Sequence, residues 1–378
     1  MPKQTHETWM ARALTLARHG LYTTDPNPRV GCVLVRDGHV VGEGFHRRAG
    51  EPHAEINALH AAGEAARGAT AYVTLEPCAH HGRTGPCADA LVEAGVARVV
   101  VAMQDPNPQV AGAGLAIMRD AGIDVITGIL EHESRRLNPG FLSRMERGRP
   151  FVRLKMATSL DGRTAMRSGE SQWITGPAAR TEVQRLRARS SAIISGVESI
   201  IFDNSRLTIR PEQLQLEEGE AIARRQPLRV IVDTQLRLPL AAACLREPGR
   251  TLIATCSDDA ERRQRLESAG AEVLILPASP EGRVELASLL RYLAHAEEAN
   301  EVLLETGATL AGAMLDAELV DEIHLFMAPI LLGGEARPLF ALPGMERMDQ
   351  QRSLDIDDIR AVGRDWRIIA RPVAEALR

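Results

Sequence analysis

The sequence contains few cysteines and few aromatic residues, and each shortage excludes a class of protein. Its five cysteines, an odd number without paired spacing, do not form the framework of a secreted disulfide protein. Aromatic residues make up 3% of the 378 residues and the net charge is -5, which argues against a nucleic-acid-binding surface. No apolar run reaches the length of a membrane span, and residues 1–7 lack the apolar core of a signal peptide. We therefore expect a soluble cytoplasmic protein without nucleic-acid or membrane partners.

The length and apolar content of the chain are sufficient for two domains. Hydrophobic residues make up 44% of the 378 positions, which is enough for two separate cores. Charged and polar residues from Glu131 to Pro150 interrupt the apolar pattern, and we place the boundary there. The predicted domains are residues 1–148 and 149–378.

The first half alternates apolar strands with helical segments. Trp9 to Ala17 has helical spacing, and a hairpin is expected around the turn Asp37-Gly38. The other expected elements are helices over 53–66 and 86–94 and one ending near 122, and strands over 30–35, 40–45, 71–75, 97–103 and 123–126. This alternation predicts a three-layer α/β domain.

Three residues in this half, His53, Cys78 and Cys87, have side chains that can bind Zn2+. A structural zinc site is closed by four protein ligands, whereas a catalytic site keeps one position for water, so three ligands indicate catalysis. Glu55 follows His53 by two residues at the predicted start of a helix, where its carboxylate can face the open position and transfer protons. Zinc lowers the pKa of bound water to about 7, which makes it a nucleophile at neutral pH.

The spacing of these residues resembles that of the zinc deaminases. In that group a His-x-Glu motif precedes a Pro-Cys motif and a second cysteine, and the Glu is the general acid and base. Eight residues separate Cys78 from Cys87 where many such enzymes have two, and we interpret the insertion as a substrate-contacting loop. Taken singly, each cysteine is more typical of a small buried apolar residue. A structural zinc site and a chance grouping are the alternatives.

Three further polar residues are candidates for contacting a substrate in the same pocket. Asn27 lies in a loop flanked by prolines, His46 ends a hairpin strand, and His80 belongs to the insertion. Buried polar groups are needed there to match the donors and acceptors of a heterocyclic base. The alternatives are an Asx-turn role for Asn27 and a solvated side chain for His46.

Apolar runs in the second half predict another complete α/β core. Strands are expected over 151–157, 192–195, 229–233, 251–255, 272–276, 301–305 and 322–326, with helical segments between most of them. The small residues from Thr306 to Ala313 follow a strand and begin a helix, an arrangement that can bind a phosphate through backbone N–H groups. Many such turns are rich in glycine for packing alone, so both interpretations stay open.

Three segments of the second half carry a further pattern: residues 156–163 (MATSLDGR), 169–176 (GESQWITG) and 207–210 (LTIR). Together with the deaminase-like first half, they resemble the bifunctional riboflavin biosynthesis deaminase-reductases. The resemblance covers nearly the whole chain, in the same domain order. It implies a cytidine-deaminase-like three-layer α/β/α domain followed by a dihydrofolate-reductase-like α/β domain.

The resemblance implies two consecutive reactions on one phosphorylated pyrimidine. The first domain would hydrolyse the 2-amino group of 2,5-diamino-6-(5-phosphoribosylamino)pyrimidin-4-one. The second would use NADPH to reduce the ribosyl chain and give 5-amino-6-(5-phosphoribitylamino)uracil. By the same resemblance, the NADPH-contacting positions are Ala157, Trp173, Ser199, Asp203, Thr234, Gly307, Ala308, Thr309, Leu310, Ala311, Gly312 and Ala313.

The resemblance also implies a substrate site in the second domain, formed by Ser171, Arg187, Leu207, Arg210 and Glu305. Guanidinium groups bind phosphate through two parallel hydrogen bonds, which suits Arg187 and Arg210 to the ribose phosphate. From residue type alone, ordinary salt bridges are the commoner role for such arginines.

Three places depart from the family's usual pattern. Glu198-Ser199 stands where a Gly-Thr pair is common, and Ser205 stands where proline is common. Thr306-Gly307-Ala308 replaces a more usual Gly-Gly-Pro. All three departures belong to the wall that would contact the cofactor.

Two other classes of protein remain as alternatives. One is a nucleic-acid base deaminase with an accessory nucleotide-binding domain, which would need the basic, aromatic surface that this composition lacks. The other is a nucleotide-binding module with a structural zinc. We also expect a homo-oligomer, with a dimer favoured, and the apolar run 323–332 is either a core strand or an edge strand that pairs between subunits.

Overall fold

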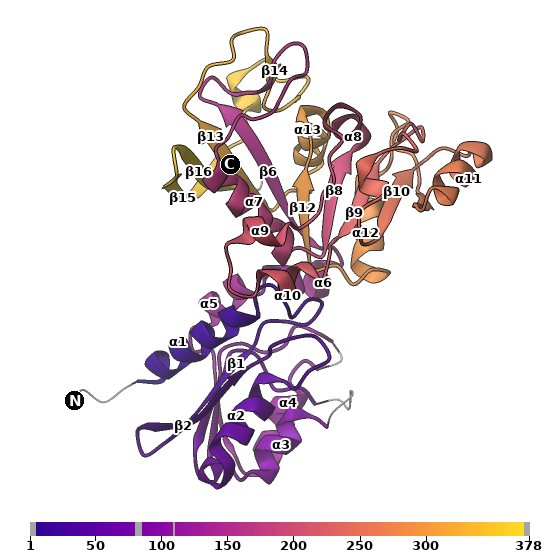
Figure 1. Cartoon of the computed structure of the whole chain (residues 1–378). Helices are drawn as coiled ribbons and strands as arrows, with labels where there is room; N and C mark the ends of the chain where they lie inside the picture. The colour runs from indigo at the N-terminus through magenta and orange to yellow at the C-terminus, as the bar shows by residue number, and fades with distance from the viewer. Residues whose placement is uncertain (1–4, 80–84, 109, 374–378) are drawn as a thin grey trace. The chain divides into compact units, whose positions relative to one another are not determined.

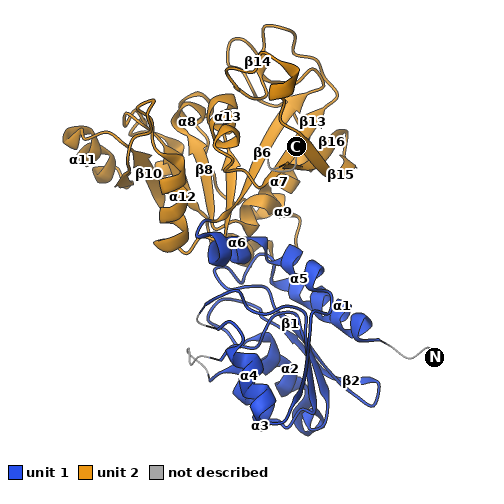
Figure 2. Ribbon diagram, turned by 180° about the vertical axis from the view of Figure 1, so that it is seen from behind, with its two compact units in different colours: residues 1–149 blue, residues 150–378 orange. Residues whose placement is uncertain are grey.

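The computed structural model describes residues 5–79, 85–108 and 110–373 (Figure 1). The chain divides into two compact units, residues 1–149 and residues 150–378, which Figure 2 shows in different colours. The predicted boundary lies one residue before this division. All five cysteines are free. No helix in the described ranges combines the length and apolarity needed to cross a membrane.

The described part of unit 1 contains a five-stranded sheet in the order β2-β1-β3-β4-β5. Its strands are β1 (Gly31–Arg36), β2 (His39–Phe45), β3 (Thr70–Val73), β4 (Arg98–Val101) and β5 (Asp124–Thr127). β1 and β2 form the predicted hairpin, in which Asp37 and Gly38 have positive φ angles. β1 pairs antiparallel with β3, while β3, β4 and β5 run parallel.

Helices cover both faces of this sheet, which confirms the three-layer prediction (Figure 1). Side chains alternate along β1: Cys32 and Leu34 pack with α2, whereas Val33 and Val35 pack with Trp9 of α1. The helices of the unit are α1 (His6–Ala17), α2 (Ala54–Ala62), α3 (Cys87–Glu93), α4 (Ala113–Asp120), α5 (Glu131–Leu137) and α6 (Pro139–Arg147), with 3-10 turns at Arg18–Gly20 and Gly63–Ala66. The charged stretch interpreted as a boundary therefore contains two helices of unit 1.

The helix α2 lies directly against strand β2. A Cβ atom on Gly44 would lie 2.6 Å from the Ala58 nitrogen, and one on Gly42 would lie 2.4 Å from the Ala58 oxygen. Only glycine allows this approach of backbone to backbone. The contact sets the place of the helix that follows His53.

In unit 2, the described residues form a nine-stranded sheet in the order β11-β10-β9-β8-β12-β6-β13-β16-β15. Its strands are β6 (Phe151–Ser159), β8 (Ala192–Gly196), β9 (Leu228–Val232), β10 (Thr251–Thr255), β11 (Glu272–Ile275), β12 (Glu301–Glu305), β13 (Glu322–Ala328), β15 (Leu354–Val362) and β16 (Asp365–Pro372). All seven predicted strands are present. The β15–β16 hairpin was not predicted, and β7 (Arg163–Ala165) and β14 (Arg337–Pro338) form a separate pair.

The strands from β11 to β13 in this sheet order run parallel, and helices cover both faces of the sheet (Figure 1). The helices are α7 (Pro177–Arg189), α8 (Val197–Asp203), α9 (Pro211–Leu214), α10 (Gly219–Ala223), α11 (Ala260–Ser268), α12 (Leu286–His295) and α13 (Ala308–Asp316), with 3-10 turns at Ala243–Leu245 and Met348–Gln350. One core packs against α12 and α13, the other against α7, α8 and α11. Because β13 lies between β6 and β16, the core interpretation of its apolar run is confirmed and the edge interpretation is wrong.

Candidate metal centre and reductase site

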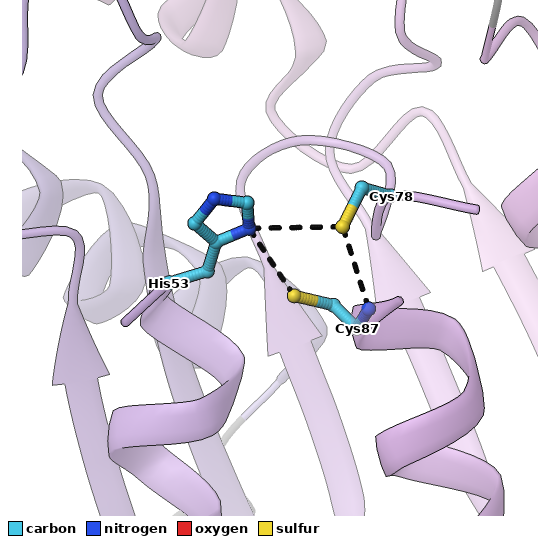
Figure 3. Close-up of side chains that lie close together, drawn as sticks. All are labelled: His53, Cys78 and Cys87. Carbon is cyan, nitrogen blue, oxygen red and sulfur yellow. Dashed lines mark hydrogen bonds between the residues drawn. The ribbon is translucent and has the colours of Figure 1, made fainter. Parts of the chain in front are cut away.

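The side chains of His53, Cys78 and Cys87 converge in unit 1, as Figure 3 shows. The His53 Nδ1 atom lies 3.6 Å from the Cys78 sulfur and 3.3 Å from the Cys87 sulfur. A tetrahedral zinc ion with ordinary bond lengths to nitrogen and sulfur requires N···S separations of about 3.5 Å. Both N···S separations therefore match those of a zinc site, and the three ligand atoms all lie within 4.8 Å of one another.

The three residues lie at the ends of separate elements. His53 is the N-cap of α2, Cys78 lies in the loop after β3, and Cys87 is the first residue of α3. The Cys87 backbone N–H donates to the Cys78 sulfur at 3.4 Å, and the partial positive charge of the helix N-terminus favours a thiolate there. Among the residues that the structure describes, His53, Cys78 and Cys87 form the group of side chains that could hold a metal ion.

Glu55 lies in the first turn of α2 with only 3% of its surface exposed. Burial raises the pKa of its carboxyl to about 7, against the opposing effects of the charge of His53 and a hydrogen bond with the Cys87 thiol. The carboxyl group therefore faces the cluster.

The hydrogen bond from Cys87, aided by His53, lowers the pKa of the Cys78 thiol despite its burial. A lowered pKa favours the thiolate form of Cys78, and the thiolate is the form that binds metal.

Asn27 and His46 lie beside the cluster. The Asn27 Nδ2 atom is 3.1 Å from His46 Nε2, and His46 Nδ1 is 3.3 Å from the Pro52 carbonyl oxygen. The His46 ring meets the His53 ring edge-on, with centroids 5.2 Å apart. His46 is 2% exposed, so the alternative of a solvated side chain is wrong, and burial lowers its pKa. His80 lies outside the described residues.

An ion pair whose side chains are 12% and 11% exposed joins Arg187 and Glu305 in unit 2. The Arg187 Nε and Nη2 atoms donate to the two Glu305 oxygens at 2.6 and 3.0 Å, and Nη1 donates to the Thr208 carbonyl at 2.8 Å. Burial tends to raise the pKa of Glu305, but the charge of Arg187 outweighs it and the pKa lies below its usual range. Burial lowers the pKa of Lys155, against the charge of Glu305. Lys155, Arg187 and Glu305 thus form one charged group.

Arg210 lines a cavity of about 530 Å³ together with Arg206 and Gln226. Its backbone N–H donates to the Gln184 side chain at 2.9 Å, and its charge contributes to the lowered pKa of Glu305. Leu207, three residues earlier, is 3% exposed and has a φ of 55°. The segment 207–210 therefore lies between the charged group and the cavity.

The residues expected to contact the cofactor lie around the carboxyl ends of β6, β8, β9 and β12. Gly196, the N-cap of α8, donates its N–H to the Thr306 hydroxyl at 3.2 Å. At the other end of α8, Asp203 accepts a hydrogen bond from the Ser171 hydroxyl at 2.8 Å. A Cβ atom on Gly307, the N-cap of α13, would lie 3.7 Å from the Ser199 hydroxyl. The starts of α8 and α13 are therefore neighbours.

The remaining predicted cofactor positions belong to other segments of unit 2 and to α13 itself. Ala157 is on β6 and Thr234 follows β9, where its carbonyl accepts from the Thr255 hydroxyl at 3.1 Å. Trp173 is 64% exposed, with the Arg180 guanidinium 4.9 Å from its ring centroid. The predicted turn forms the first part of α13, with residues Ala308, Thr309, Leu310, Ala311, Gly312 and Ala313. Packing explains Gly312, because a Cβ atom there would lie 1.9 Å from the Ala341 oxygen.

Sequence reasoning missed one buried charged residue beside the metal cluster. Glu76 is 4% exposed and immediately precedes Pro77-Cys78. The sequence does contain an indication of Glu76: an acidic residue stands between an apolar strand and a predicted metal ligand, where a buried acid has no obvious partner. Its partners are backbone groups from a distant segment, which no local pattern indicates.

A three-layer unit with a His-Cys-Cys cluster and a buried acid defines the zinc-dependent deaminase class. Residues 3–103 match the family model for the cytidine and deoxycytidylate deaminase zinc-binding region. Residues 150–368 match the model for the RibD C-terminal domain, so a deaminase unit precedes a reductase unit.

Whole-chain comparisons agree with this division. The riboflavin biosynthesis protein RibD of Escherichia coli is 50% identical, over 95% of this chain and 97% of its own length. A solved structure of Acinetobacter baumannii RibD is 47% identical with a TM-score of 0.90, covering 98% of this chain and 99% of that one. The Thermotoga maritima diaminohydroxyphosphoribosylaminopyrimidine deaminase/5-amino-6-(5-phosphoribosylamino)uracil reductase is 34% identical with a TM-score of 0.84, covering 97% and 99%.

This chain belongs to the RibD family of bifunctional deaminase-reductases of riboflavin biosynthesis. The family resemblance drawn from the sequence and the predicted fold class are thereby confirmed. The matches favour this function over that of a nucleic-acid base deaminase.

Proposed function

We propose that unit 1 hydrolyses the 2-amino group of 2,5-diamino-6-(5-phosphoribosylamino)pyrimidin-4-one. Unit 2 then reduces the ribosyl chain of the product with NADPH, giving 5-amino-6-(5-phosphoribitylamino)uracil. The observation that carries the proposal is the cluster of His53, Cys78 and Cys87 with the buried Glu55 beside it, in a chain of the RibD family. The two activities are those that the description of the Thermotoga maritima relative names.

In the deamination, a C–O bond to water forms and the C–N bond to the amino group breaks. Zinc bound by His53, Cys78 and Cys87 would supply an activated water at neutral pH. Glu55 takes a proton from the attacking water and delivers it to the ring nitrogen. It then transfers the remaining proton of the added hydroxyl group to the amino group, which leaves as ammonia. The buried carboxyl, with its pKa of about 7, suits a group that both accepts and donates a proton.

Asn27 and His46 are the proposed contacts for the pyrimidine. Because His46 Nδ1 faces the Pro52 carbonyl, it carries the hydrogen, and Nε2 accepts from the Asn27 amide. This pairing orients the Asn27 carbonyl oxygen as an acceptor for an amino group. His80 remains a proposed contact from the insertion.

In the reduction, NADPH supplies the hydride and the protein supplies position and electrostatics. We assign its phosphates to the starts of α8 and α13, which are neighbours, because the first backbone N–H groups of a helix can bind a phosphate. Glu198, one of the departures from the family pattern, pairs with Arg237 at 2.6 Å. The proposed cofactor contacts are Ala157, Trp173, Ser199, Asp203, Thr234 and residues 307–313.

The proposed substrate site of unit 2 comprises Ser171, Arg187, Leu207, Arg210 and Glu305. Arg187 already makes its bidentate contact with Glu305, so Arg210, which lines the cavity, is our first choice for the phosphate. Arg187 holds Glu305 charged beside Lys155.

We further propose that the chain forms a homodimer through the exposed edge of unit 2. β15 ends the nine-stranded sheet, and its backbone can pair with a second copy. Ile356, Ile359 and Trp366 of the terminal hairpin are 59%, 53% and 45% exposed. Isologous pairing of two such edges would continue the sheet across both copies and extend the apolar face to which these side chains belong.

The test supplies the diaminopyrimidine phosphate to the full chain with and without NADPH, and follows ammonia and nicotinamide absorbance separately. Ammonia should appear under both conditions, and NADPH oxidation should follow only after deamination. Ammonia release without NADPH oxidation would refute the reductase assignment, and failure to release ammonia would refute the deaminase assignment.

A further inference from the structure

Glu76 connects strand β3 to the metal ligand Cys78 and is 4% exposed. Its backbone N–H donates to the Met103 carbonyl at 3.0 Å, which continues the pairing of β3 with β4. Its carboxylate oxygens accept four backbone N–H groups, those of Asp105 (3.1 Å), Gly112 (3.0 Å), Gly114 (3.0 Å) and Leu115 (3.3 Å). A buried carboxylate is thus satisfied by backbone groups from a separate segment.

The four donors lie at the two ends of the loop that leads into α4. Asp105 begins this loop, and Gly114 and Leu115 belong to the first turn of the helix. The first N–H groups of a helix have no partner within the helix, and a negative charge there is favoured by the helix dipole. Glu76 therefore closes the loop and caps the helix at once.

The same helix start touches the backbone next to Cys78. A Cβ atom on Gly114 would lie 2.0 Å from the Pro77 carbonyl oxygen, so α4 packs directly against the peptide that precedes Cys78. On the other side, the Ala88 N–H of α3 donates to the Cys78 carbonyl at 3.2 Å. The backbone of Cys78 is held between the starts of two helices.

We propose that Glu76 is a positioning residue for the metal ligand Cys78. Its four hydrogen bonds hold α4 against Pro77 and so set where the Cys78 sulfur lies relative to His53 and Cys87. The inference rests on the proposed metal site and adds a group that does not itself touch the metal. Groups that orient a metal ligand typically change metal affinity by about 10- to 100-fold when they are lost.

Two variants perturb this arrangement without altering a ligand. Glu76→Gln keeps the size of the side chain, but in either orientation its NH2 group faces two N–H donors. Gly114→Ala places a methyl group against the Pro77 carbonyl. Val35→Ala is the control, because Val35 is also buried in unit 1 but pairs with Thr70 at the opposite end of β3.

The experiment measures Co2+ and Zn2+ affinity by competition with a chelator, and the absorption of the Co2+-loaded full-length chain. We expect Glu76→Gln and Gly114→Ala to weaken metal binding by about 10- to 100-fold and to shift the cobalt-thiolate bands. Val35→Ala should leave both unchanged, and NADPH-dependent reduction of the deaminated pyrimidine should persist in all three variants.

Unaltered affinity and spectrum in Glu76→Gln would overturn the inference. Loss of folded unit 1 in both variants would also overturn it, because Glu76 would then serve the fold and not the ligand. Failure of the unmutated chain to bind Co2+ with thiolate bands would instead reject the metal site itself, so the two failures are distinguishable.

Discussion

Glu55 and His53 are separated by one residue, yet their side chains have different roles in the proposed reaction. His53 caps α2 and turns its Nδ1 atom to the two sulfurs, whereas Glu55 lies in the first turn with its carboxyl buried beside Cys87. A buried acid that stays close to a metal without binding it can move protons during each turnover.

Replacing Glu55 with Gln removes this proton transfer and keeps the shape of the side chain. We expect ammonia release to fall by about 10²- to 10⁴-fold, which is the usual contribution of general acid-base catalysis. Zinc content, measured by atomic absorption, should remain at the unmutated level. NADPH oxidation with the deaminated substrate serves as the internal control. Retention of full deamination would refute the role of Glu55.

The ion pair of Arg187 and Glu305 is the corresponding residue-scale feature of unit 2. Removing one partner of a buried pair leaves an uncompensated charge and typically costs about 3–5 kcal/mol. The Arg187–Glu305 side chains are 12% and 11% exposed, so we expect Glu305→Gln to lower the free energy of unfolding of unit 2 by up to this amount, as measured by calorimetry of the full chain. The matched control is Glu272→Gln, which breaks a half-exposed pair with Arg250 and should cost less than about 1 kcal/mol.

The lowered pKa of Glu305 also predicts how this stabilisation depends on pH. Unfolded glutamate titrates near pH 4.3, and the folded pKa is lower, so the unfolded chain binds more protons between the two values. The contribution is therefore complete above about pH 5 and is lost as the pH falls through the folded pKa. The difference in melting temperature between the unmutated chain and Glu305→Gln should shrink below about pH 4.3. A melting-temperature difference that does not change with pH would argue against a stabilising role for the charge of Glu305.

At the scale of elements, the β15–β16 hairpin combines a free edge with exposed apolar side chains. A register shift between Ile356 and Asp358 pairs Ile356 with Ala370 and Ile359 with Ile368. Ala370 and Ile368 are two positions apart on β16, so their side chains, and those of the two isoleucines, lie on the same face. Without this β-bulge the two isoleucines, three positions apart, would point to opposite faces. The bulge thus gathers apolar side chains on one face of the hairpin.

This arrangement predicts the effect of a charge on the hairpin. Ile356→Lys should weaken the proposed dimer at least about tenfold, because a lysine on an edge strand replaces an apolar contact with a charge and disfavours pairing with a second edge. Sedimentation velocity of the full chain across a concentration series measures the change. Arg352→Lys, which keeps its charge near the same strand, is the control. A chain that sediments as a monomer at all concentrations would exclude the dimer.

At the scale of the whole molecule, two sheets carry two sites with separate chemical needs. The metal cluster belongs to unit 1, and the charged group of Arg187 and Glu305 belongs to unit 2. Removing zinc with a chelator should therefore abolish ammonia release and leave reduction of the deaminated substrate intact. Adding zinc back should restore deamination. Parallel loss of both activities, with no unfolding by circular dichroism, would contradict the assignment of metal to one unit.

Much of the fold followed from local patterns. The hairpin around Asp37-Gly38, the alternating strands and the helix after His53 depend on residues within about ten positions of one another. The missed β15–β16 hairpin has exposed residues along most of β15, so it lacks the alternation that marks a half-buried strand. The stretch from 131 to 147 forms two helices, but its many charged residues led to its interpretation as a domain boundary.

The sequence by itself determined the chemistry of the chain: a histidine, two cysteines and an acid at deaminase spacing, followed by the segments typical of the reductase. Only the tertiary structure decided that β13 is interior, that Arg187 pairs with Glu305, and that Glu76 binds the start of α4. The physical reason is that spacing along the chain sets the period of a helix or strand. Contacts between residues tens or hundreds of positions apart depend on the order of strands in the sheet, which local spacing does not encode.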